Sequence, residues 1–150
     1  MRVPTLFMPV GIVASGKTTE SRIWAKENSP SIIIEVDKFR TLFHDTYTFD
    51  PKEEQLIWDL VVTSASHWLL EHVNVVVDDA VFFLSRKRRE EFISDLENWI
   101  PESFEYTPLW AYLPIPTDEQ VAERRGKEGR GYSVEEWVAV ARRQREELEQ

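Results

Sequence analysis

The sequence predicts an α/β fold in which a parallel sheet of about four strands lies between helices on both of its faces. Two observations lead to this prediction. Short apolar runs alternate along the chain with longer segments of helical character, which is the pattern of parallel strands joined by crossover helices. In addition, a glycine-containing segment with phosphate-binding character follows the first apolar run and opens the first helix.

The first third of the chain is predicted to form a strand, a helix and a second strand. Thr5–Val10 is an apolar run, and a helix is expected from Lys17 to about Asn28, where Pro30 stops it. Ser31–Val36 contains three consecutive isoleucines, and β-branched residues favour a strand.

A long helix is predicted after Asp50. Asp50 can cap the helix, Pro51 suits its first position, and Glu53 follows three residues after the cap. We expect one face of this helix to be apolar and to pack on the sheet. The residues assigned to that face are Leu56, Ile57, Leu60, Val61, Trp68 and Leu69.

The second half of the chain continues the alternation. Val73–Val77 is predicted as a third strand, Ser85–Ile100 as a helix, and Phe104–Leu113 as a segment that contains a fourth strand. Two further helices are predicted to begin at capping boxes, in which a Thr or Ser is followed three residues later by Gln or Glu. These boxes are Thr117 with Gln120 and Ser133 with Glu136.

Composition limits the class of protein. A chain of 150 residues suits one domain, residues 1–150, with a single core. It contains no cysteine, so disulfides and thiolate metal sites are excluded, and a cytoplasmic location is expected. No segment approaches the roughly 20 apolar residues that span a bilayer, so no membrane partner is expected. The net charge of −9 makes the chain a poor non-specific ligand for nucleic acid, and a polyanion would need a local basic patch.

Gly11–Thr18 carries the strongest functional signal. Its sequence, Gly-Ile-Val-Ala-Ser-Gly-Lys-Thr, matches the P-loop (Walker A) pattern G-x-x-x-x-G-K-[ST] in full. Backbone N–H groups of such a loop point at phosphate oxygens, the lysine reaches the β- and γ-phosphates, and the Thr18 hydroxyl is a magnesium ligand. The motif therefore predicts the three-layer P-loop NTPase fold with ATP and Mg²⁺ as cofactors. The nucleotide-binding residues expected here are Gly11, Ala14, Ser15, Gly16, Lys17, Thr18 and Thr19.

Carboxylates follow the next two predicted strands. Asp37 ends the second strand, and Asp78 and Asp79 end the third. Because the carboxyl ends of parallel strands share one edge of the sheet, these carboxylates should lie beside the P-loop. Asp37 is the candidate general base, and Asp78 or Asp79 the candidate for the magnesium shell. The alternatives are a helix cap for Asp37 and a strand-end turn for the aspartate pair.

Two segments are rich in arginine. Residues 124–132, with Arg124, Arg125 and Arg130 among three glycines, are predicted to form a lid whose arginines reach the transferring phosphate; a solvated charged loop is the alternative. Arg86–Arg89 is the most concentrated basic run. It hints at an anionic partner, although pairing with Glu90 and Glu91 one turn later explains much of it.

These segments together resemble the group of P-loop kinases that includes polynucleotide 5′-hydroxyl kinases, chloramphenicol phosphotransferase and zeta toxins. Gly11–Thr18 resembles the nucleotide loop of the group, Val36–Arg40 the segment after the second strand, and Val75–Asp79 the third strand with its terminal acid. The resemblance implies that Asp37 is the general base and that Arg40, three residues later, binds the acceptor.

The resemblance also implies roles for the other charged residues. Asp78 would belong to the magnesium site and Asp79 to the substrate site. Among the lid arginines, Arg125 and Arg130 would be catalytic and Arg124 would bind nucleotide, although Arg124 and Arg125 compete for one role. Lys17 is both nucleotide-binding and catalytic.

The expected activity is transfer of the γ-phosphate of ATP to a hydroxyl acceptor. The leading acceptor is a 5′-hydroxyl of a polynucleotide or nucleoside. Ala80-Val81 after Asp79 replaces the Thr-Asn usual in polynucleotide kinases and favours a small-molecule acceptor such as an antibiotic or sugar. A nucleotide-binding ATPase module is a further alternative, but it would need no acceptor base at Asp37.

Overall fold

A computed structural model describes residues 2–44, 50–79, 82–126 and 132–148. Within these residues, four parallel strands form one sheet in the order β2–β3–β1–β4. The strands are β1 (Thr5–Val10), β2 (Ser31–Glu35), β3 (Asn74–Asp78) and β4 (Thr107–Tyr112). The α/β fold class and the four-stranded parallel sheet are therefore confirmed.

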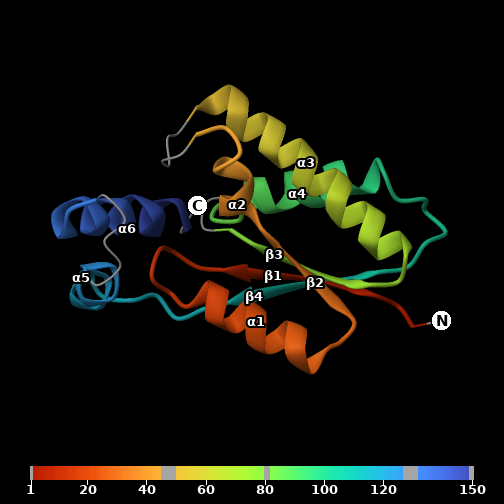
Figure 1. Ribbon diagram of the computed structural model, residues 1–150, viewed down its shortest axis with the longest axis horizontal. Coiled ribbons are helices and arrows are strands. Elements are labelled where there is room, and N and C mark those ends of the chain that lie inside the picture. The colour runs from red at the N-terminus through yellow and green to blue at the C-terminus, as the bar shows by residue number, and fades with distance from the viewer. Residues whose placement is uncertain (1, 45–49, 80–81, 127–131, 149–150) are drawn as a thin grey trace.

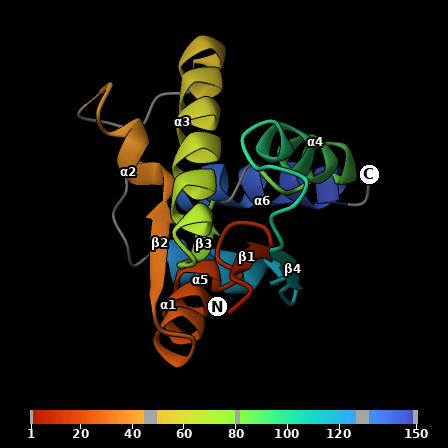
Figure 2. The ribbon, with the colours of Figure 1, turned by 90° about the vertical axis from the view of Figure 1, so that its right-hand side faces the viewer.

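Helices cover both faces of the sheet, as Figures 1 and 2 show. Helix α1 (Lys17–Glu27) lies on one face, and α3 (Pro51–Leu70) and α4 (Arg86–Glu97) lie on the other. The short helix α2 (Val36–Arg40) directly follows β2. The predicted helix starts agree with the structure: the Asp50 carboxylate accepts hydrogen bonds from Lys52 N and Glu53 N, and Ser85 caps α4.

Two further helices lie beyond the carboxyl ends of the strands, at the left of Figure 1. They are α5 (Asp118–Gly126) and α6 (Val134–Leu148). Both capping boxes are formed, because Gln120 N donates to Thr117 Oγ1 at 3.2 Å and Glu136 N donates to Ser133 Oγ at 3.2 Å. The helices α5 and α6 thus flank the segment 124–132 that the sequence assigned to a lid, of which residues 127–131 lie outside the described residues.

The core lies between the sheet and the α3–α4 layer. The buried face of α3 agrees with the prediction at Ile57, Val61 and Leu69, but Leu56, Leu60 and Trp68 are exposed. Trp58 is buried instead and packs with Phe82 and Phe92. The residues that α3 buries are Ile57, Trp58, Val61, Val62, Ala65, Ser66 and Leu69. The helix has apolar residues on more than one stripe, and the position of α4 decides which stripe is covered.

Across the described residues, no helix combines the length and the apolar character that a bilayer crossing requires.

Candidate active site

The P-loop connects β1 to α1, and its backbone requires small residues at defined places. A Cβ atom at Gly11 would lie 2.3 Å from Ser15 Oγ and 3.0 Å from Ser15 Cβ, so a larger residue there would force Ser15 to shift. Gly16 has φ of 92° and precedes the first residue of α1, a conformation that glycine adopts without strain. Ala14 also has positive φ, 64°, which is unfavourable for a residue with a Cβ atom. The loop is therefore held in a curled shape that its sequence alone would not favour at Ala14.

Lys17 is buried at the start of α1. Its Nζ atom donates to Ile12 O at 2.6 Å and to Ser15 Oγ at 3.4 Å. Burial lowers the pKa of this ammonium to about 8, although Asp79, Asp78 and Asp37 act in the opposite direction. The Arg125 guanidinium is near enough to lower the pKa further. The ammonium therefore interacts with carboxylates at the ends of β2 and β3 and with a guanidinium near the end of α5.

Thr18 and Asp78 meet across the site. Thr18 Oγ1 donates to Asp78 Oδ2 at 2.9 Å, because β3 lies beside β1 and both strands end at this edge. Burial raises the pKa of Asp78, and the hydrogen bond from Thr18 opposes that shift.

A hydroxyl and a carboxylate beside a phosphate loop suit Mg²⁺, which binds few protein ligands and keeps phosphates and waters. Among the residues described, no group of three or more His, Asp or Glu could hold a metal alone. Thr18 and Asp78 fit an ion that arrives with a triphosphate.

The second carboxylate of the pair, Asp79, has a different environment. Its side chain is only 1% exposed, and it accepts hydrogen bonds from Phe82 N at 3.0 Å and from Arg40 Nη1 at 2.6 Å. Arg40, also buried, donates to Glu54 of α3 through Nε and Nη2, at 2.9 and 2.8 Å. Burial alone would lower the pKa of Arg40, but the hydrogen bonds to Glu54 and Asp79 raise it above its ordinary value.

Asp37 is the accessible member of this charged group. It lies in the first turn of α2, its side chain is 66% exposed, and Oδ1 accepts from Arg40 Nη1 at 2.7 Å. The turn of helix places Asp37 and Arg40 three residues apart on one side of α2. One guanidinium therefore joins an exposed carboxylate to the buried Glu54 and Asp79. The sequence offered no signal for Glu54, whose partner lies on another helix.

The helix hairpin contacts the P-loop directly. Arg124 Nη1 donates to Ala14 O at 2.6 Å, and Val13 N donates to Gln144 Oε1 of α6, also at 2.6 Å. Arg125 lies over the Trp137 ring, 5.1 Å from its centroid. Arg130, like residues 127–131 of the expected lid as a whole, lies outside the described residues, as do Ala80 and Val81. Gln144 was missed from sequence because it is 131 positions from its partner.

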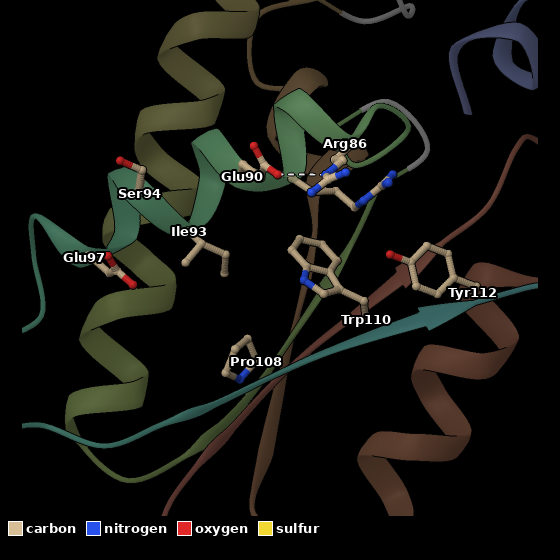
Figure 3. A pocket seen from close by; sticks show the side chains of 9 residues that line it. Arg86, Glu90, Ile93, Ser94, Glu97, Pro108, Trp110 and Tyr112 are labelled. Carbon is tan, nitrogen blue, oxygen red and sulfur yellow. Dashed lines mark hydrogen bonds and ion pairs between the residues drawn. The ribbon is translucent and has the colours of Figure 1, made fainter. Parts of the chain in front are cut away.

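Three arginines of the basic run Arg86–Arg89 are paired with other groups of the protein. Arg86 pairs with Glu90 at 2.9 Å, and Arg88 pairs with Glu91 and stacks on Trp58. Arg89 donates to the backbone oxygens of Phe83 and Leu84. A groove of about 540 Å³ runs along α4, between that helix and β4 (Figure 3). Because glutamates line it beside the arginines, the groove does not form a local basic patch.

Comparison with solved structures identifies the fold. Two structures of the Pnkp1/Rnl/Hen1 complex, one described as an RNA repair complex, match with TM-scores of 0.68 and 0.71 and identities of 20% and 19%. The matches cover 83% and 97% of this chain. The chain spans only 40% and 46% of the length of those two chains.

Two kinases match over more of their own length. A gluconokinase from Sinorhizobium meliloti has a TM-score of 0.62 at 17% identity, covering 100% of this chain and 78% of its own. The Mycobacterium tuberculosis APS kinase CysC, in complex with AMPPNP and APS, has a TM-score of 0.58 at 17% identity, covering 85% and 70%.

Sequence comparison adds nothing to these structural matches, since no family model and no curated protein matches the chain. At identities this low the likeness concerns the fold. The four-stranded parallel sheet, the P-loop after β1 and the helices on both faces give this chain the fold of the P-loop kinases.

Proposed function

We propose that this protein is a phosphotransferase that moves the γ-phosphate of ATP to a hydroxyl acceptor in the presence of Mg²⁺. The observation that carries the proposal is the exposed Asp37 carboxylate, held by Arg40 at the sheet edge where Lys17 and the Thr18–Asp78 pair also lie. A hydrolase needs a positioned water, whereas transfer needs a carboxylate that faces an incoming hydroxyl.

The nucleotide-binding residues follow from the loop geometry. Backbone N–H groups from Ala14 to Thr19 would surround the phosphates, and the Lys17 ammonium would neutralise their charge. Thr18 and Asp78 would hold Mg²⁺, which supplies neutralisation of the charge that develops on the phosphate oxygens. Lys17 would exchange its bonds to Ile12 O and Ser15 Oγ for phosphate oxygens.

Asp37 is proposed as the general base. Its free carboxylate oxygen would accept the proton of the acceptor hydroxyl as that oxygen attacks the γ-phosphate. Arg40 has its guanidinium engaged by three carboxylates, so we propose that it acts on the acceptor chiefly by orienting Asp37. Asp79 would act through Arg40 in the same way. Arg124 is bound to Ala14 O, whereas the charge of Arg125 already lowers the pKa of Lys17. Arg125 is therefore the better placed of these two arginines to meet the transferring phosphate.

The acceptor class is the less constrained part of the proposal. A 5′-hydroxyl of a polynucleotide or nucleoside is the leading candidate, and likeness to chains of an RNA repair complex favours it. A small-molecule hydroxyl is the second candidate, favoured by the likeness to a gluconokinase over the whole chain and by the net charge of −9.

The test is transfer from γ-labelled ATP to a panel of hydroxyl compounds, with and without Mg²⁺. The panel contains a 5′-hydroxyl oligonucleotide, nucleosides, sugars and hydroxylated antibiotics. Labelled product from one class, absent with Asp37→Asn, is the expected result. Release of labelled phosphate at the same rate with and without every acceptor would instead support an ATPase module.

A further inference from the structure

Two side chains of the α5–α6 hairpin hold neighbouring backbone groups of the P-loop. The Gln144 side chain, on α6, accepts a hydrogen bond from Val13 N at 2.6 Å. Arg124, near the end of α5, donates to Ala14 O at 2.6 Å. The first bond is buried, so water does not compete for it, and Gln144 is 9% exposed. The loop is thus held from the hairpin side by two polar contacts.

These contacts flank the strained residue of the loop. Ala14 has φ of 64°, a conformation that costs free energy for a residue with a Cβ atom, unlike Gly16 with φ of 92°. Val13 N belongs to the Ile12–Val13 peptide group, one residue before Ala14, and Ala14 O belongs to the peptide group that directly follows Ala14, so the two bonds hold the loop backbone on either side of the strained residue. Surrounding structure must supply the free energy that keeps Ala14 in this conformation.

Polar and apolar contacts join the two helices of the hairpin to each other and to the loop. Asp118 of α5 accepts from Arg145 Nη1 at 2.5 Å and from Arg142 Nη2 at 3.0 Å, which joins the two helices. These hydrogen bonds lower the pKa of Asp118, because they stabilise its charged form. An apolar cluster also buries the loop against the hairpin. Its members are Ile12, Val13, Leu84, Val121 and Ala141.

We propose that Gln144 is a positioning residue that holds the P-loop in its phosphate-binding shape before nucleotide arrives. The inference rests on the proposed nucleotide-binding function of the loop. By fixing Val13 N, Gln144 orients the following N–H groups toward the phosphates and lowers the entropy that binding must remove. It touches neither nucleotide nor acceptor, and it acts on affinity through the loop backbone.

The test is Gln144→Met, which keeps the length of the side chain but removes the oxygen acceptor. We expect the KM for ATP and the dissociation constant of MgATP to rise about three- to tenfold, with kcat changed less than twofold. Gln55→Met, on an exposed turn of α3, is the matched control and should leave both constants unchanged. A dissociation constant of Gln144→Met within twofold of wild type would overturn the proposal.

Hydrogen exchange of the nucleotide-free protein gives a second measurement that needs no ATP. The Val13 amide should exchange faster in Gln144→Met than in wild type, and Gln144→Glu, which keeps an oxygen acceptor, should restore its protection. Equal exchange in all three proteins would contradict the tether. If wild type binds no MgATP, the proposed function fails, while the Val13 exchange rates still decide whether Gln144 holds the loop.

Discussion

The proposed phosphate side and the proposed acceptor side of the site are built by different means. On the phosphate side, eight consecutive residues, Gly11–Thr18, form a backbone cradle with one buried lysine. On the acceptor side, a single guanidinium, that of Arg40, joins carboxylates from α2, from α3 and from the segment after β3. The first arrangement is local and depends on loop shape. The second exists only after three separate segments have packed, so loss of one of its buried charges should affect folding as well as chemistry.

Asp37→Asn should have the largest effect on transfer. Loss of a general base costs about a hundred- to ten-thousandfold in rate, and Asn cannot accept the acceptor's proton. Because the Asp37 side chain is 66% exposed, unfolding free energy should change by no more than about 1 kcal/mol. Transfer rate, MgATP affinity and thermal midpoint are measured together. Asp59→Asn, on the exposed side of α3, is the control. Transfer within tenfold of wild type would remove Asp37 from the mechanism.

Lys17→Ala should damage the phosphate side without unfolding the protein. Removing the ammonium should lower transfer at limiting ATP by roughly a hundred- to a thousandfold, since the buried charge acts on phosphate oxygens. Lys26→Ala, on the exposed part of the same helix, is the control and should behave as wild type. Near-normal MgATP binding by calorimetry in the Lys17 variant would contradict the assignment of the loop.

Arg40→Leu should show the opposite pattern, a loss of stability. It leaves Glu54 and the buried Asp79 facing each other without their shared cation, and breaking a buried ion pair costs about 3–5 kcal/mol. Arg86→Leu, which removes an exposed pair with Glu90, should cost less than about 1 kcal/mol. Urea unfolding of both variants measures the difference. Similar midpoints for the two would mean that the acceptor side is not held together by Arg40.

The smallest expected effect is a pH dependence from Lys17. Its folded pKa of about 8 lies below its ordinary value, so between pH 8 and 10.5 the unfolded chain binds more protons than the folded one. Lys17 therefore destabilises the nucleotide-free fold below pH 8, and that penalty is lost as pH rises. The stability of wild type relative to Lys17→Met should increase by roughly 1 kcal/mol per pH unit over this range. If the difference in unfolding free energy between wild type and Lys17→Met, measured with denaturant, did not change with pH, the ammonium would not be buried.

Sequence reasoning succeeded where the signal is local. The strands are runs of apolar residues, the caps of α3, α5 and α6 are set by residues within one turn, and the P-loop is contiguous. It failed on half of the residues assigned to the buried face of α3, because packing against Phe92 of α4 buries Trp58 rather than Leu60. Glu54 and Gln144 could not be found, since their partners lie on other elements.

Pro108 has a consequence for how copies of this protein meet one another. Strand β4 is at the edge of the sheet, and Thr107 N and Leu113 N donate inward to Pro4 O and Val10 O. Amide groups alternate along a strand, so the outward position next to Thr107 belongs to Pro108, which has no N–H. Edge strands with unpaired donors invite another chain to extend the sheet, and a proline there removes one donor. Pro108 therefore makes the β4 edge of the sheet a poorer template for aggregation through added strands.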